Sequence, residues 1–249
     1  MPKTRPAEPR DGERLPKYLV IRNWVLGQIS DGTFVRGTQL PSEHDVMTQF
    51  GVSRVTARQA FDALRVSGVV EARRGKGYFV SGLCATASLE RLQSFGEMMA
   101  PLGVATHSDV LGLMEIPADR HVADALRVDA GSAVIHLARA RKAGSTLISL
   151  DIGYLPRAIG RKLMLLDLAR QDVFLLMEKR LDIEIGYADL TLAVEEVPAA
   201  LAPLLGVKAK DRVLCLKRLT LSNSGEPLMF ERIYARLDVL QFRVRVPRW

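Results

Sequence analysis

Residues 41–58, PSEHDVMTQFGVSRVTAR, decide the fold of the first third of the chain. Ser42, with Asp45 three positions later, predicts the start of a short helix, because a hydroxyl and a carboxylate at this spacing cap free backbone amides. Gly51 predicts the end of that helix, since glycine readily takes the left-handed conformation. Ser53 then begins another helix. Two helices joined by a tight turn form the unit that many proteins place in the major groove of DNA.

The segments on either side predict the rest of a winged helix-turn-helix domain. A helix is expected from about Pro16 to Ser30, where apolar residues recur at helical spacing. In the helix that Ser53 begins, one apolar stripe is expected to be buried, consisting of Ala57, Ala60, Phe61 and Leu64. Residues 69–72, VVEA, and 78–80, YFV, predict the two strands of a hairpin. Three helices followed by a hairpin is the order of a winged helix-turn-helix.

Polar residues at the start of the third helix suit DNA. Ser53 and Thr56 lie in its first turn, where hydroxyls and free backbone amides can bind phosphate oxygens. Arg54 and Arg58 are four residues apart and share a face, and guanidinium groups bind guanine or phosphate. The alternative is a solvated basic face on a packing helix. That alternative would be favoured for the arginine pair alone, but the whole arrangement favours DNA binding.

The hairpin tip, residues 72–80 (ARRGKGYFV), admits a different interpretation, a phosphate loop for a nucleotide. Such a loop needs G-x-x-x-x-G-K followed by Ser or Thr, between a strand and a helix. Here Lys76 is followed by Gly77 and then by a strand, so the nucleotide interpretation fails. A wing that contacts DNA phosphates fits better, with Gly75 and Gly77 allowing close approach. The basic residues of this tip are Arg73, Arg74 and Lys76.

Composition and charge agree with a DNA-binding module joined to a nearly neutral one. The chain has 249 residues, 48% of them hydrophobic, and a formal net charge of +7. Residues 1–82 hold 13 Lys and Arg against 8 Asp and Glu, a balance of +5, which leaves +2 for the remainder. The two cysteines, Cys84 and Cys215, are isolated, so no disulfide framework, metal site or cofactor is expected. No signal peptide or membrane span is expected either, and the cytoplasm is the expected location.

The chain is expected to divide into four parts. These are a flexible tail (1–13), the winged helix-turn-helix (14–80), a linker (81–87) and a second domain (88–249). In the second domain, helices are expected near 88–102, 119–127, 171–181 and 198–205. Strands are expected at 108–116, 133–142, 146–155, 185–197, 212–222 and 227–235. Strands joined by tight turns, with helices between them, indicate an α+β fold on an antiparallel sheet with flanking helices.

Residues 17–80 resemble the N-terminal domain of GntR-family transcription regulators. The resemblance rests on LPSE at 40–43, FGVSR at 50–54, the T-x-R that follows, and GYFV at 77–80. It implies that Arg54, Thr56 and Arg58 contact DNA. His44 stands where the family often has an arginine that touches the operator, which implies a weaker or altered contact there.

Residues 88–246 resemble the effector-binding UTRA domain of the HutC subfamily, whose fold is like that of chorismate lyase. The segments that carry the resemblance are SLERLQSFGEMMAPLG, LARARKAGSTLISLDIGYLP and GEPLMFERIYARLD. It implies an effector site that includes Ser94, Phe95, Arg139, Arg141, Asp151 and Glu231. Two arginines beside a carboxylate suit an anionic or zwitterionic small molecule. The alternative is an exposed cross-strand ion pair.

Three positions depart from the family pattern. Asp151 replaces the usual Glu, Ala235 replaces a common Tyr, and Phe174 stands at a frequent pocket Tyr. These differences put a sugar-phosphate effector in doubt and favour a different, less polar ligand.

The sequence therefore predicts a ligand-responsive bacterial transcription regulator, a repressor that binds a palindromic operator in double-stranded DNA as a homodimer. Two alternatives remain at this point. One is a small-molecule enzyme of the lyase-like fold with a DNA-binding appendage, although no catalytic constellation stands out. The other is a DNA-binding protein that responds to no effector.

Overall fold

A computed structural model describes residues 15–66, 68–81, 85–100, 106–144 and 146–248. The chain forms two units, and the main break between them falls between Thr86 and Ala87. The expected flexible tail, 1–13, lies outside the described residues, as do positions 82–84 of the expected linker.

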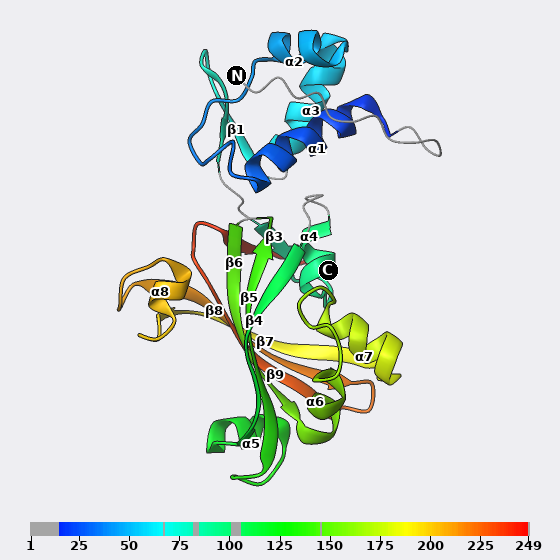
Figure 1. Cartoon of the computed structure of the whole chain (residues 1–249), viewed down its shortest axis with the longest axis vertical. Helices are drawn as coiled ribbons and strands as arrows, with labels where there is room; N and C mark the ends of the chain where they lie inside the picture. Colours follow the sequence, from blue (N-terminus) through cyan, green and yellow to red (C-terminus); the bar gives the residue numbers. More distant parts are fainter. Residues whose placement is uncertain (1–14, 67, 82–84, 101–105, 145, 249) are drawn as a thin grey trace. The chain divides into compact units, whose positions relative to one another are not determined.

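The N-terminal unit has the element order that the sequence predicts. Its elements are α1 (Lys17–Ser30), α2 (Glu43–Phe50), α3 (Arg54–Val66), β1 (Val70–Arg73) and β2 (Gly77–Val80). The strands β1 and β2 pair in antiparallel fashion, with Arg73 opposite Gly77 at the tip. The winged helix-turn-helix prediction is confirmed (Figure 1).

The caps and the buried stripe of this unit form as expected. The Ser42 hydroxyl accepts the Asp45 amide at 3.2 Å, and the Asp45 carboxylate accepts the Ser42 amide at 2.9 Å. Gly51 ends α2 in the left-handed conformation, with φ of 61°. The predicted stripe of α3 is fully buried. Tyr78 of the hairpin stacks on Phe61, with ring centroids 4.2 Å apart, and therefore fixes the wing against α3.

The C-terminal unit is an α+β domain built on an antiparallel sheet of six strands, in the order β4-β5-β6-β9-β8-β7. The strands are β4 (Thr106–Pro117), β5 (Ala133–Ala143), β6 (Thr146–Pro156), β7 (Ile185–Glu196), β8 (Arg212–Ser222) and β9 (Pro227–Ala235). The helices are α4 (Phe95–Met99), α5 (Arg120–Leu126), α6 (Arg157–Leu163), α7 (Val173–Leu181) and α8 (Ala202–Leu205). A separate pair joins β3 (Ala85–Ser88) to β10 (Leu240–Arg243).

Four elements of this unit differ from the expectation, and one of them is β10, where no strand was expected. Residues 85–88 form β3 instead of linker, and of the helix expected near 88–102 only Phe95–Met99 is helical in the described part. The partner of β3 is β10, more than 150 residues away, and no local pattern in small residues such as ATAS could predict that pairing. The short helix α6 was also not predicted.

The two faces of the sheet are covered by different helices. On one face, α6 and α7 pack on β5 and β6 in a core that includes Ile135, Leu155, Leu163 and Met177. On the other face, α8 packs beside Leu150 and Cys215, and α5 beside Val134 and Phe230. Figure 1 shows α6 and α7 on the side of the sheet away from α8. The site described below lies on the face that α6 and α7 partly cover.

Gly160 sets the approach of α6 to the sheet, and Gly160→Ala should lower the free energy of unfolding. A β-carbon at position 160 would overlap the side chain of Ile135, so the buried helix would have to move away from β5. Overpacking of this kind costs about 1–3 kcal/mol. Calorimetric unfolding of the full chain measures the change.

The matched control is Gly27→Ala in α1, where a β-carbon meets no atom within 4 Å. Because alanine favours a helix over glycine, this change should stabilise the protein by about 0.5–1 kcal/mol. Equal effects of the two substitutions would contradict the close packing of α6 on Ile135.

Candidate functional site

The first turn of α3 presents the polar residues that the sequence singles out. The Ser53 hydroxyl accepts the Thr56 amide at 3.3 Å and lies 3.0 Å from the Thr56 hydroxyl. Arg54 is 76% exposed, and its Nε donates to Glu43 Oε2 at 3.1 Å. Arg58 is exposed, and it forms no ion pair with any other residue of the described ranges. Arg58 is therefore available to an external acceptor, whereas Arg54 shares its charge with Glu43.

His44 lies in the first turn of α2 and is exposed. The residue before His44 is Glu43, which binds both Arg54 and the hydroxyl of Tyr78, the latter at 3.2 Å. Glu43 thus connects α2, α3 and the wing. It was not predicted as a site residue, although its place in the first helical turn beside two predicted contacts could have suggested it.

The wing tip depends on two glycines. Gly75 and Gly77 have φ of 72° and 96°, values that favour glycine, and Gln39 Nε2 donates to the carbonyl of Lys76 at 2.7 Å. Arg73 is paired with Glu71 and lies over the ring of Phe79 at 4.3 Å. The exposed side chains of Arg74 and Lys76 make no ion pair with the rest of the described chain. The tip therefore offers Arg74 and Lys76 to a partner.

A buried set of charges lies on the sheet of the C-terminal unit. Four of the residues expected in the effector site are at most 4% exposed, namely Arg139, Arg141, Asp151 and Glu231. Arg141 Nε lies 3.7 Å from Asp151 Oδ2, and Arg139 Nη2 lies 3.7 Å from Glu231 Oε1. The prediction that Arg139, Arg141 and Asp151 share one face is confirmed. The alternative of an exposed cross-strand ion pair is wrong, because these side chains are buried.

Two further charged residues complete the set, and the sequence reasoning missed both. Arg218 of β8 bonds to Glu231 Oε2 through Nε at 2.8 Å and Nη2 at 2.6 Å. Asp172, the N-cap of α7, accepts Arg141 Nη2 and the Gly96 amide, each at 3.0 Å. An aspartate just before a helix predicts a cap, but no sequence pattern links it to Arg141, 31 residues away.

Burial changes the acidity of these groups. Burial raises the pKa of Asp151 above its usual range, despite the nearby guanidinium groups of Arg141 and Arg139. Burial also acts on Asp172, but there Arg141 and the Gly96 amide outweigh it and lower the pKa. Burial lowers the pKa of Arg139 to about 10. Of the three buried carboxylates, Asp151 thus accepts the fewest hydrogen bonds.

Register explains why the charges meet. In the antiparallel sheet, Glu231 stands opposite both Gly153 and Arg218, and Arg218 stands opposite Leu190. In the neighbouring row, two residues along, Ile233 stands opposite Asp151 and Leu216. Side chains two residues apart on a strand lie on the same face of the sheet. Both rows therefore lie on one face, and together they form the floor of the site.

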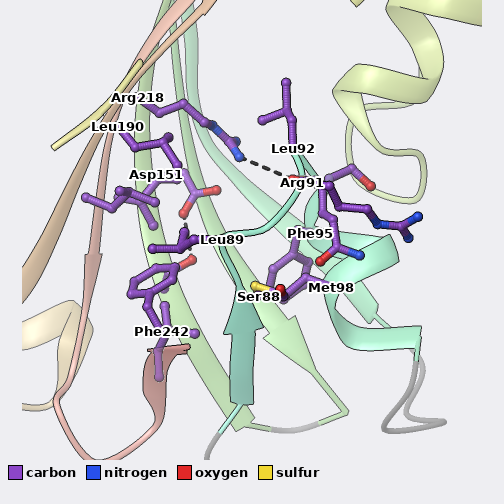
Figure 2. Close-up of a pocket in the computed structure, with 16 residues that line it drawn as sticks. Ser88, Leu89, Arg91, Leu92, Phe95, Met98, Asp151, Leu190, Arg218 and Phe242 are labelled. Carbon is purple, nitrogen blue, oxygen red and sulfur yellow. Dashed lines mark hydrogen bonds between the residues drawn. The ribbon is translucent and has the colours of Figure 1, made fainter. Parts of the chain in front are cut away.

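A cavity of about 60 Å³ lies above this floor (Figure 2). Its cover comes from residues 88–98 and from Leu240 and Phe242 of β10. Of the expected effector residues, Ser94, Phe95 and Asp151 line this cavity, and Arg218 joins them. Arg139 and Glu231 are not among its lining residues.

Ser94 and Phe95 are held in place locally. The Ser94 hydroxyl accepts the Glu97 amide at 3.2 Å, and the Glu97 carboxylate accepts the Ser94 amide at 2.8 Å, so Ser94 caps α4. The Arg141 guanidinium lies 4.4 Å from the centroid of the Phe95 ring. Phe95 and Arg141 also line a second hollow, of about 220 Å³, beside His107 and Arg170.

Among the described residues, no group of three His, Cys, Asp or Glu side chains could hold a metal ion. No helix in the same part of the chain is long and apolar enough to cross a membrane.

Comparison with known proteins identifies the families of both domains. Residues 17–80 match the family described as bacterial regulatory proteins, gntR family, and residues 102–241 match the UTRA domain. The chain is similar to the HTH-type transcriptional regulator Rv0792c of Mycobacterium tuberculosis, with 27% identity over 94% of this chain and 87% of that protein. It is also similar to the HTH-type transcriptional repressor NagR of Bacillus subtilis, with 27% identity over 85% of this chain and 86% of the relative.

Solved structures show the same fold. The crystal structure of PhnF from Mycobacterium smegmatis aligns with a TM-score of 0.68 at 24% identity, over 91% of this chain and 99% of PhnF.

Proposed function

Because the chain belongs to the gntR family of bacterial regulatory proteins and carries a UTRA domain, it is a transcription regulator, and we propose that it represses transcription by binding an operator until a small effector binds the UTRA domain. Relatives named as repressors support this direction of control. We place this activity in the cytoplasm, where the DNA is. The observation that carries the proposal is Arg58 on the first turns of α3, which is exposed and makes no ion pair with another described residue of this winged helix-turn-helix protein.

We propose that DNA is bound by the start of α3 and by the wing. The predicted contacts are His44, Ser53, Arg54, Thr56, Arg58, Arg74, Gly75, Lys76 and Gly77. All of these residues are exposed except Thr56, which is half-buried, and this exposure supports the assignment, since base edges and phosphates must reach them. Arg58 is the best candidate for a base contact, and Arg74 and Lys76 for phosphate contacts.

We propose that the effector lies in the cavity above the buried charges. Ser94, Phe95 and Asp151 would contact it directly, because they line the cavity. Arg139, Arg141 and Glu231 would act from below, by holding the charges of the floor in place. An effector that occupies the cavity also touches its cover, residues 88–98, which follow the DNA-binding domain closely in sequence. Effector binding would change the affinity for DNA if residues 88–98 have different conformations in the DNA-bound and the effector-bound protein.

We infer a homodimer, because a two-fold protein reads a palindrome with two copies of one recognition helix. The edge strand β7 supports this inference. It pairs with β8 on one side, and it exposes Tyr187, Leu192 and Val194, at 50%, 40% and 49%. Exposed apolar side chains on an edge strand suit contact with a second copy.

Titration of the full chain against palindromic DNA from upstream of its own gene tests the function. We expect binding that falls steeply with salt, since each neutralised phosphate releases a counterion. A single half-site should bind at least about tenfold more weakly than the whole palindrome, because only one of the two recognition helices then contacts its half-site. Equal affinity for palindrome, half-site and unrelated DNA would contradict a sequence-specific dimeric regulator.

A further inference from the structure

We propose that the effector is an uncharged, mainly apolar molecule whose single hydroxyl or amide head group donates a hydrogen bond to Asp151. This inference rests on the proposed effector site and names the chemical class of its ligand. It differs from the anionic or zwitterionic effector expected from two arginines and one carboxylate, because Glu231, Arg218 and Asp172 lie in the same set of charges.

The charges beneath the cavity already balance. Three guanidinium groups, of Arg139, Arg141 and Arg218, face three carboxylates, of Asp151, Asp172 and Glu231. All six side chains are at most 16% exposed. A charged ligand would add an uncompensated charge to this buried, balanced set, which is costly, since the one further charged residue of the lining, Arg91, is exposed to solvent. An ammonium would lie near the guanidinium group of Arg218, and a carboxylate would lie near Asp151.

The walls of the cavity are mainly apolar. Nine of the sixteen lining residues are hydrophobic, and those from the sheet and its cover include Leu89, Leu92, Leu190, Leu216, Ile233 and Phe242. Figure 2 shows Asp151 on the same side of the lining as Leu89, Leu190 and Phe242, with Phe95 and Met98 on the opposite side. A sugar or a phosphate would bring many polar groups into a lining that is more than half apolar, and those that face the apolar residues would lack partners.

Glu231 Oε1 accepts no hydrogen bond, but Glu231 does not line the cavity. The carboxylate that a ligand in the cavity can reach is Asp151. It receives one hydrogen bond from the described side chains, from the Ser149 hydroxyl to Oδ1 at 2.6 Å. Its Oδ2 lies 3.7 Å from Arg141 Nε, beyond hydrogen-bond distance, although the residue is only 4% exposed. The raised pKa of Asp151 agrees with this shortage of donors. A hydroxyl or amide hydrogen from the ligand would supply the missing bond without changing the charge.

Three probes that share one apolar body test the ligand class: benzyl alcohol, benzylamine and benzoate. Ligand-observed NMR titrations with the full-length protein measure the three dissociation constants, with glucose 6-phosphate as a polar probe. We expect benzyl alcohol to bind at least about tenfold more tightly than either charged probe. Tighter binding of benzylamine, benzoate or glucose 6-phosphate would overturn the proposal, and so would failure of benzyl alcohol to bind at millimolar concentration.

The variant Asp151→Asn tests the charge balance directly. It leaves three guanidinium groups against two carboxylates, so benzoate should now bind more tightly than benzyl alcohol. Asp129→Asn, an exposed position outside the cavity, is the matched control and should keep the wild-type order. Ser149→Ala alters a polar contact of the cavity but no charge, so it should also keep that order. An unchanged order in Asp151→Asn, or a reversed order in Ser149→Ala, would overturn the proposal.

Operator binding by the same preparations separates the two levels of inference. If the protein binds its palindrome but prefers a charged probe, only the ligand class is wrong. If it binds no operator, the proposed function fails, whatever the order of the probes. Thermal unfolding of each variant shows whether it is folded. If Asp151→Asn does not fold, the order of probe affinities in the wild-type protein and in Ser149→Ala decides the ligand class.

Discussion

Arg58→Ala should lose specific operator binding while the protein remains folded. Arg58 lies on α3 away from the buried stripe, and it makes no ion pair within the described part of the chain. Its truncation therefore removes neither packing nor an internal charge partner. The midpoint of thermal unfolding should stay close to that of the wild type, because exposed substitutions of this kind change stability by about 0.5 kcal/mol or less.

The size of the expected loss follows from the number of contacts. A good arginine contact with a base is worth about 1–3 kcal/mol of discrimination. Two copies would act in the proposed dimer, so we expect a loss of about 2–6 kcal/mol, which is at least about thirtyfold in affinity. Fluorescence anisotropy with the palindrome, in the presence of excess unrelated DNA, measures the specific part of the binding.

Arg65→Ala is the matched control. Arg65 is exposed on the last turn of the same helix and pairs with Asp62 at 3.4 Å, so it lies far from the end that enters the groove. It should change operator affinity only slightly. If Arg65→Ala and Arg58→Ala weaken binding equally, Arg58 contributes only general charge, and the assignment of the start of α3 to base recognition is wrong.

The DNA-binding domain could be predicted from the sequence because its signals are local. Ser42 and Asp45 cap a helix three residues apart, and Gly51 ends it, so each boundary is set by neighbours in the chain. The buried stripe of α3 follows from helical spacing alone. In the second domain, the same reasoning found the six strands of the sheet, whose alternation and turns are also local.

The candidate effector site could be predicted only in part. The pair Arg139 and Arg141 is visible as two charges in an apolar strand. By contrast, Arg218 and Asp172 join the site through sheet order and through the position of α7, which the sequence pattern does not fix. With them and Glu231, the set holds three guanidinium groups and three carboxylates, whereas the ligand class was expected from Arg139, Arg141 and Asp151 alone, two positive charges and one negative. Long-range pairing therefore decided the chemistry of the site more than the residues found by pattern.

Glu231→Gln should strongly destabilise the protein. Glu231 is fully buried, binds Arg218 at 2.6 and 2.8 Å, and faces Arg139 at 3.7 Å. Loss of its charge leaves two buried guanidinium groups short of a counter-charge, and breaking a buried pair in this way costs about 3–5 kcal/mol. Urea unfolding of the full chain, followed by circular dichroism, measures the loss in free energy of unfolding.

Two further variants show whether buried charge is the cause. Glu195→Gln removes the carboxylate of a half-exposed pair, in which Glu195 lies 2.6 Å from Lys217, and should cost no more than about 1 kcal/mol. The double variant Glu231→Gln with Arg218→Met should recover part of the stability, because an apolar side chain needs no counter-charge. If the double variant is as unstable as the sum of the two single changes, loss of packing explains the effect, and the balanced charges beneath the cavity do not stabilise the fold.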